Sequence, residues 1–252
     1  MKKSKISIYS YADTALPHLG KIVAANETVL KKLAAALVKG VPAGKRLLVF
    51  GSGHSAIFPM ELYHRAGGAA FVVPVVAEYL LPTAGPSVVR VLERTSGAAT
   101  PAFNRVAPKK GEMLWLASNS GINAAVVELA LEAGKRGLKT VAFTNLAHSR
   151  AVPSRHASGK RLFEVCDEVV DIGGVRGDAA IPLASRDKGT VSAGPLSTLS
   201  TVLLGNSVLV LAMAELEKKG HPCVYTSVNT PEGETRNRKL EAAAAKTDFL
   251  LR

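Results

Sequence analysis

Two loops rich in serine, asparagine and glycine carry the clearest chemical signal in this sequence. The first is Gly51–Ser55 (GSGHS) and the second is Ser118–Asn123 (SNSGIN). Serine hydroxyls and asparagine amides donate hydrogen bonds, and glycine lets the backbone approach a bound group closely. A helix that starts directly after such a loop adds unpaired N–H groups and a partial positive charge. The pattern favours binding of an anion, most simply the phosphate of a small metabolite. Taken singly, either loop could also be an ordinary helix cap.

Each loop follows a short apolar run that is typical of a strand buried on both faces. Residues 47–50 (LLVF) precede the first loop and residues 113–117 (MLWLA) precede the second. Similar runs at 69–76, 140–143 and 168–172 alternate with helical patterns, which predicts βαβ units and a parallel sheet. Ligands of such sheets collect at the carboxyl ends of the strands, near the point where strand order reverses. Both loops are therefore expected at that edge.

The helical patterns predict a three-layer αβα sandwich around a five-stranded parallel, Rossmann-like sheet. Apolar residues recur at three- and four-residue spacing between 14 and 39, and residues 195–219 read as a long, largely buried helix. Since no repeat or linker divides the chain, we expect a single domain over residues 1–252. Its parts would be an N-terminal helical segment at about 10–42, a core at about 45–220 and a C-terminal tail at 221–252.

Two segments fit this alternation less well. Residues 82–110 are rich in glycine and proline, and could form a lid, a subunit contact or a wandering crossover between strands. Residues 231–238 are polar and predict a turn-rich stretch ahead of a short helix at 240–246.

Composition excludes several classes of protein. The net charge is +12, but the basic residues are dispersed and only one Trp and five Tyr are present, which disfavours a nucleic-acid surface. Attraction of anionic metabolites, or plain solubility, explains the charge better. Neither GxGxxG nor GxxxxGK[ST] occurs, which disfavours a nucleotide site. The longest apolar stretch, 202–216, is shorter than the roughly 20 residues of a membrane span. With two distant cysteines and no signal peptide, we expect a cytoplasmic protein with no nucleic-acid or membrane partner.

The two loops and several further segments resemble the SIS (sugar isomerase) domain. This is the phosphosugar-binding module of phosphoheptose isomerase and of the isomerase part of glucosamine-6-phosphate synthase. The likeness is closer to the UPF0309-type bacterial proteins, and it extends over nearly the whole chain. It rests on Gly51–Ser55, Glu61, Arg65–Gly68, Ser154–His156, Ser158–Arg161, Gly177–Ala179, Gly194–Pro195 and a tail resembling 229–240.

The resemblance implies a phosphorylated sugar as the ligand and no cofactor. It implies a homodimer or homotetramer with sites near the subunit boundaries. Residues at the start of the long late helix, Ser197 and Thr198, could also contact the substrate. The phosphate contacts that it implies are Ser118, Asn119, Ser120 and Asn123, with Ser52 and Ser55 beside them.

The commonest chemistry on such a ligand is aldose–ketose isomerisation through an enediol, which needs a base to move a proton between C1 and C2. Glu61 is the candidate base, because related isomerases place a glutamate on the helix after the first loop. It could equally be a surface glutamate paired with Arg65. His54, in the first loop, and His156, after the fourth strand, are the candidates for proton transfer at oxygen.

Other functions stay open beside the isomerase. Relatives of this branch carry His and Glu where this chain has Ala56 and Met60, and the isomerases carry a late-helix histidine that 195–219 lacks. A non-catalytic phosphosugar sensor and a lyase or etherase acting on an amino-sugar phosphate are therefore the alternatives. Arg155, Lys160 and Arg161 could meet a carboxylate or a second phosphate, or form a solvated charged face. No HxxxH or HExxH spacing occurs, so no metal is expected.

Overall fold

A parallel five-stranded sheet forms the centre of the protein. The structure, a computed structural model, describes residues 6–185 and 191–251. The strand order is β2-β1-β3-β4-β5, so the chain moves to one side of β1 to make β2 and to the other side for the rest. The order therefore reverses between β1 and β3, and the fold class expected from the sequence is confirmed. The strands are β1 (Leu47–Gly51), β2 (Val72–Val75), β3 (Met113–Ala117), β4 (Lys139–Thr144) and β5 (Glu168–Asp171).

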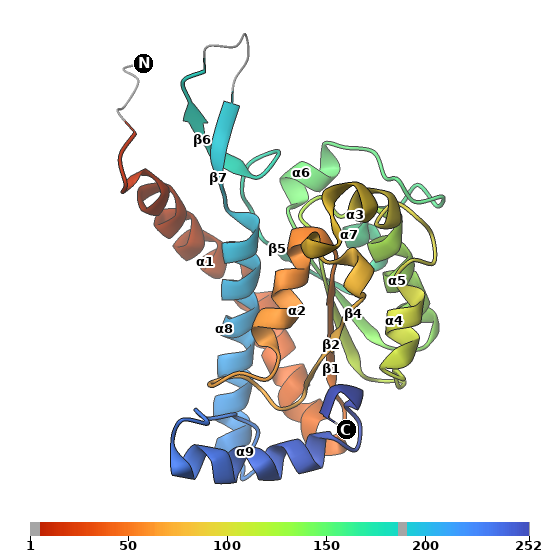
Figure 1. The fold of residues 1–252 in the computed structure, drawn as a ribbon, viewed down its shortest axis with the longest axis vertical. Helices are drawn as coiled ribbons and strands as arrows, with labels where there is room; N and C mark the ends of the chain where they lie inside the picture. Colours follow the sequence, from red (N-terminus) through yellow and green to blue (C-terminus); the bar gives the residue numbers. More distant parts are fainter. Residues whose placement is uncertain (1–5, 186–190, 252) are drawn as a thin grey trace.

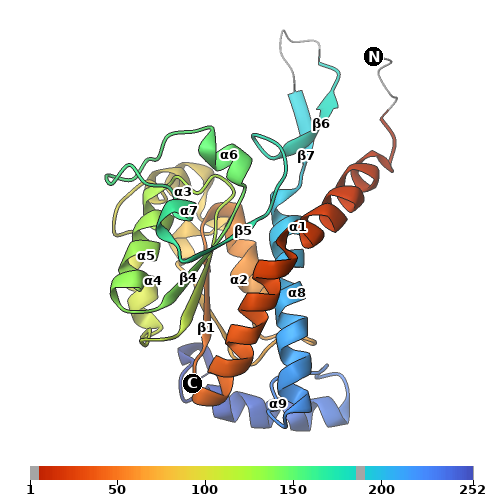
Figure 2. The same cartoon turned by 180° about the vertical axis from the view of Figure 1, so that it is seen from behind.

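Helices cover both faces of this sheet, as Figures 1 and 2 show. Strand side chains alternate between the two layers: Leu47 and Val49 belong to one buried cluster, and Leu48 and Phe50 to the other. The first cluster is completed by α1 (Ser10–Gly40), α2 (Ile57–Leu62) and α8 (Ser197–Lys218). The second is completed chiefly by α4 (Thr100–Arg105), α5 (Ala124–Lys135) and α7 (Leu162–Val165).

The remaining elements lie at the two edges of the sheet. In Figure 1, α3 (Pro86–Leu92) and α6 (Leu146–Arg150) lie at one end of the sandwich and α9 (Pro231–Ala244) at the other. A hairpin of β6 (Ala179–Leu183) and β7 (Val191–Pro195) projects beside the first residues of α1. The 3₁₀ turns are η1 (Val41–Ala43), η2 (Gly53–Ala56), η3 (Glu78–Leu80), η4 (Pro82–Ala84) and η5 (Phe249–Leu251).

The sequence-based expectation for the tail was wrong. Residues 231–244 form one helix, where a turn-rich stretch and a shorter helix were expected. Thr230 caps this helix, because its Oγ1 accepts a hydrogen bond from Gly233 N at 3.2 Å, and Pro231 occupies its first turn. The polar composition that suggested a turn belongs to a mostly polar helix, of which only Gly233, Asn237 and Leu240 are buried.

The helix after the first loop, α2, has only six residues. It ends at Leu62, Tyr63 is extended, and His64 has a φ of 40°. His64 thus lies beyond the helix that carries Glu61, and its Nε2 is 2.8 Å from Glu241 Oε1 of α9.

One long apolar helix, α8, occurs among the described residues. By length and composition alone it could cross a membrane, but half of its most apolar stretch is buried inside the protein. Its buried residues, Leu204, Val208 and Leu216 among them, pack with α1 and α2 in the first cluster. Core packing therefore accounts for the apolar residues on its buried side.

A buried ion pair joins the C-terminal end of the chain to the amino edge of the sheet. The Arg46 side chain is 6% exposed and that of Glu112 is fully buried, with 2.6 Å between Arg46 Nε and Glu112 Oε1. Arg46 Nη1 also donates to the carbonyl oxygens of Thr247, at 2.6 Å, and Val106, at 3.0 Å. One guanidinium therefore holds β1, the segment before β3 and the tail together.

Removing one partner of this pair should destabilise the protein strongly. In Glu112→Ala the Arg46 guanidinium stays buried without a counter-charge, so we expect the free energy of unfolding to fall by about 3–5 kcal/mol. Glu132→Ala, which breaks the partly exposed pair with Arg136 on α5, should cost only about 0.5 kcal/mol. Urea denaturation followed by circular dichroism measures both. Equal losses in the two variants would contradict the role given to Arg46.

Candidate functional site

A cavity of about 370 Å³ lies at the carboxyl edge of the sheet, where the strand order reverses. The first loop contributes two serines to the cavity wall. The second loop contributes every one of its residues except Gly121. The crossover before β3 and the segment after β4 supply the rest. The lining residues are Ser52, Ser55, Glu93, Ser118, Asn119, Ser120, Ile122, Asn123, His148, Val152 and Arg155.

Hydrogen bonds from the end of β4 and from the segments after it hold the backbone of the second loop in place. Asn119 O accepts hydrogen bonds from Asn145 N, at 3.1 Å, and Thr144 Oγ1, at 3.3 Å. Leu162 N donates to Gly121 O at 2.7 Å. Gly121 has a φ of +61°, and a Cβ on it would lie 2.9 Å from Thr144 Oγ1. Only glycine fits there, so the loop takes one tight path with its side chains facing the cavity.

Capping does not explain the asparagine at the end of this loop. Asn123 is the N-cap residue of α5 by position, but its side chain makes no capping hydrogen bond. Its Oδ1 accepts from Arg155 Nη1 at 2.9 Å. The N–H of Ala125 in the first turn donates to the carbonyl of Glu93 at 3.1 Å. The Asn123 side chain is thus part of the cavity wall. The segment that carries Glu93 covers part of the N-terminus of α5.

The first loop contributes hydroxyl groups. A Cβ on Gly51 would lie 2.1 Å from Ser55 O, so glycine is required for the chain to fold back this closely. The loop continues into η2 and the six-residue α2, which are too short to offer the helix N-terminus that the sequence predicts. Ser52 and Ser55 are its two residues on the cavity.

A small recess adjoins the cavity and holds three more of the predicted residues. His54, Ser197 and Thr198 line it, together with Phe58 and Thr201, and it shares Ser55 and Asn119 with the main cavity. Ser197 is held in place because its Oγ donates to Asp178 Oδ2 at 2.7 Å. All eight residues predicted to bind the ligand therefore line one of two adjoining spaces.

Two of the predicted catalytic residues lie outside these spaces. Glu61 is at the end of α2, where its carboxylate forms an ion pair with Arg65, as the surface interpretation expected. His156 is in a turn, with its Nδ1 2.8 Å from Ser158 Oγ. Neither residue lines the cavity or its recess.

Glu93 lines the cavity and was not identified from the sequence. Burial raises the pKa of its carboxyl above the ordinary 4.5, against the opposing effects of Arg94, Arg155 and a hydrogen bond with Asn123. It lies in the irregular 82–110 segment, more than thirty residues from the first loop, so no local motif marks it. The only sequence signal was the irregularity of that segment.

His148 is the second cavity residue that sequence reasoning missed. Burial, and then the charge of Arg176, lower the pKa of its imidazole, while Asp178 opposes them. It is therefore neutral at pH 7. Its Nδ1 is buried and has no hydrogen-bond partner among the described residues, as is also true of Asn119 Oδ1 and Ser149 Oγ. Unsatisfied polar atoms at a cavity are typical of a site that awaits a ligand.

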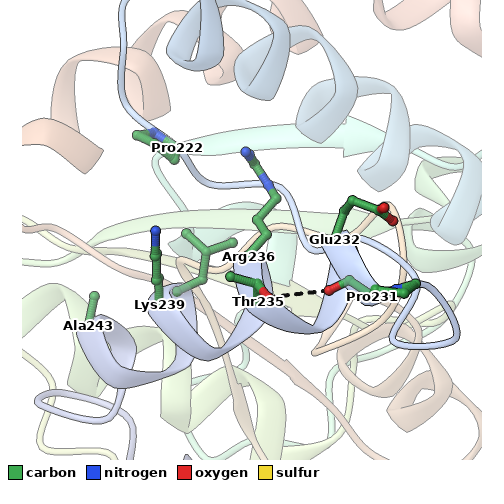
Figure 3. Close-up of a pocket in the computed structure, with 8 residues that line it drawn as sticks. Pro222, Pro231, Glu232, Thr235, Arg236, Lys239 and Ala243 are labelled. Carbon is green, nitrogen blue, oxygen red and sulfur yellow. Dashed lines mark hydrogen bonds between the residues drawn. The ribbon is translucent and has the colours of Figure 1, made fainter.

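A larger hollow, of about 900 Å³, lies on α9 far from these groups. Figure 3 shows that one side of α9 forms most of its wall, with Pro222 opposite. The arginine that lines this hollow already has protein partners: Arg236 Nε donates to Val224 O at 2.9 Å, and Arg236 Nη2 forms an ion pair with Glu217. It is open, and no imidazole lines it. We therefore place the candidate site in the smaller cavity, where polar groups converge.

In the part of the chain that the structure describes, no three His, Cys, Asp or Glu side chains are grouped closely enough to hold a metal ion. The polar groups that line the cavity are hydroxyls, amides, the Glu93 carboxylate, the His148 imidazole and the Arg155 guanidinium.

The raised pKa of Glu93 predicts that its ionisation costs stability. The folded state binds this proton more tightly than the unfolded state, so stability falls as pH rises through the window above 4.5. Glu93→Gln removes the cost, and its melting temperature at pH 7 should exceed that of the parent, with the gain vanishing well below pH 4.5. Glu78→Gln is the matched control. Its own backbone N–H and Arg105 lower the pKa of Glu78, so this change should give no gain. A loss of stability in Glu93→Gln at pH 7 would be the contrary result.

The chain matches known proteins along most of its length. A family model for the SIS domain matches residues 10–145. A UPF0309 protein of Shouchella clausii is 32% identical over 235 residues, covering 92% of this chain and 94% of the relative. A UPF0309 protein of Geobacillus thermodenitrificans is 35% identical over 211 residues, covering 83% of this chain and 84% of the relative. A solved phosphoheptose isomerase from Francisella tularensis is 15% identical, with a TM-score of 0.47, covering 84% of this chain and 96% of that one. The resemblance read from the sequence is confirmed: the chain belongs to the SIS domain family, among its UPF0309 members.

Proposed function

We propose that this protein binds a phosphorylated sugar with its phosphate on the Ser118–Asn123 loop. One observation carries the proposal: the serine-rich loops after β1 and β3 converge on a single cavity at the point where strand order reverses. Six hydroxyl or amide side chains from these loops line the cavity, and Asn123 is one of them. Hydroxyls and amides can donate several hydrogen bonds to phosphate oxygens at once. Membership of the SIS family points to the same class of ligand.

The size and charge of the cavity suit such a ligand. About 370 Å³ lies within the range of roughly 300–1,000 Å³ that small-molecule sites occupy, and near its lower end. Arg155 supplies a cation at the cavity wall, next to Asn123. A single sugar with one phosphate would bring its charge to Arg155 and the loops, and its hydroxyls to the remaining polar groups.

The activity we propose is aldose–ketose isomerisation of the sugar phosphate through an enediol. A carboxylate and an imidazole with pKa values shifted by burial line the same cavity, and such groups are typical of catalytic sites. This observation favours an enzyme over a non-catalytic sensor. A lyase or etherase acting on an amino-sugar phosphate starts with the same proton removal and is the second candidate. Roles for Glu61, His54 and His156 in the reaction stay predictions, as does a cytoplasmic location.

Replacing one hydroxyl of the second loop tests the phosphate site. Ser120→Ala should weaken binding of inorganic phosphate and of every sugar phosphate by about 10- to 150-fold, because one hydrogen bond to a charged group contributes about 1.5–3 kcal/mol. Ser207→Ala is the control, since that hydroxyl donates to Leu203 O within α8 at 2.8 Å. Isothermal titration calorimetry measures both. Unchanged affinities in Ser120→Ala would rule out this loop as the phosphate site.

We also propose that the protein is a homodimer or homotetramer. Large apolar side chains are exposed on α8, in the first turns of α1 and just before α1; examples are Val210 at 61%, Leu16 at 67% and Ile8 at 88%. A second copy of the chain would cover them. Sedimentation velocity should give a species of at least twice 26.4 kDa, and Val210→Glu should shift it towards the monomer. A parent protein that sediments as a monomer at tens of micromolar would refute this.

A further inference from the structure

We propose that Glu93 is the catalytic base that removes the proton from the carbon next to the carbonyl of the substrate. In the same proposal, His148 exchanges protons with the oxygens. This inference rests on the proposed function and adds the groups that perform its chemistry. Both residues line the cavity that the two serine loops form.

Glu93 stands between the two loops. Its backbone carbonyl accepts a hydrogen bond from Ala125 N, in the first turn of α5, at 3.1 Å. Its carboxylate lies beside the first loop, because Glu93 Oε2 would be only 3.8 Å from a Cβ built on Gly53. It also interacts with Asn123, at the end of the second loop. The carboxylate therefore faces the space where a sugar held by its phosphate would extend.

The segment that carries Glu93 is docked firmly on the body of the protein. Gly97 N donates a hydrogen bond to the Glu128 carboxylate on α5, and Tyr79 Oη donates to Ala98 O at 2.7 Å. Phe103, ten residues further on, is fully buried in the second core cluster. These contacts favour the crossover interpretation of 82–110 over a loose lid, and they fix the position of the carboxylate.

The environment of Glu93 makes its carboxylate a stronger base than an exposed one. Its partial burial disfavours the ionised form, whereas Arg90, Arg94 and Arg155 nearby favour it. Burial outweighs the arginines and raises the pKa of the carboxyl, so the carboxylate accepts a proton more readily than an exposed one.

His148 provides the matching group at oxygen. As a neutral imidazole it carries one N–H donor and one acceptor nitrogen, so it can give a proton to one oxygen and take one from another. One of its ring nitrogens is buried without a partner among the described residues. Its backbone is held by the Asn145 side chain, which accepts from His148 N at 2.9 Å.

The reaction balances with these two groups alone. Glu93 takes the proton from C2 of the open-chain aldose, the C–H electron pair forms the C1–C2 double bond, and the carbonyl electrons move to O1. O1 takes a proton from His148, which gives the enediol. His148 then recovers the proton of O2 as the carbonyl forms at C2, and Glu93 returns its proton to C1. An elimination begins with the same first transfer to Glu93 and then expels a group from C3.

Hydrogen exchange with solvent tests this assignment. The protein is incubated in D₂O with arabinose 5-phosphate, fructose 6-phosphate or N-acetylmannosamine 6-phosphate, and deuterium entering at carbon is followed by NMR. Wild-type protein should label at least one of them. Glu93→Gln, which keeps the shape of the side chain, should lower that rate about 10²–10⁴-fold, with phosphate affinity within about threefold of wild type. His148→Asn should also lower it. Glu78→Gln, an exposed glutamate of the neighbouring segment, should not.

Three outcomes separate the possibilities. Exchange that survives in Glu93→Gln but disappears in Glu61→Gln would transfer the role to Glu61 and overturn the proposal. Wild-type protein that binds these sugar phosphates and exchanges none of their carbon-bound protons would overturn it as well. Wild-type protein that binds none of them would instead refute the proposed function.

Discussion

The close approach of the second serine loop to the segments after β4 is the constraint on which the site depends. Gly121 lies so near Thr144 and Ser149 that a single added carbon would push the loop outwards. Hydrogen bonds from Asn145, Arg155 and Leu162 hold the loop backbone from the same side. Because these contacts use backbone atoms, most side chains of the loop remain available to the cavity. The sheet brings the two loops together, because the paired strands β1 and β3 end side by side where the strand order reverses.

Buried polar groups at the two edges of the sheet differ in whether they have hydrogen-bond partners. At the amino edge, Arg46 and Glu112 are buried but fully paired, and they join the tail to the sheet. At the carboxyl edge, the imidazole Nδ1 of His148 and the amide oxygen of Asn119 are buried and have no hydrogen-bond partner among the described residues, and burial raises the pKa of the Glu93 carboxyl. Such groups cost stability, and folded proteins retain them mainly where a ligand or a reaction needs them. The contrast supports placing the proposed site at the carboxyl edge.

The sequence predicted the sheet and the two loops because both signals are local. Buried strands appear as apolar runs, and each loop directly follows one, as with 113–117 and Ser118. Local patterns failed where distant segments decide the outcome. Glu93 reaches the cavity because its irregular segment docks on α5, and no periodicity records that docking. His148 and His156 both follow β4, but the short α6 brings only the first to the cavity wall. The polar residues 231–238 suggested turns, since a helix with few apolar positions has a weak period.

A crystal structure of the protein grown or soaked with arabinose 5-phosphate tests the central claim most directly. The account predicts density for the phosphate between the two serine loops, with its oxygens about 3 Å from donors of Ser118, Ser120 or Ser55, and the sugar extending towards Glu93 and His148. Phosphate bound at the α9 hollow beside Arg236 and Lys239, with the loop cavity left without ligand, would contradict it.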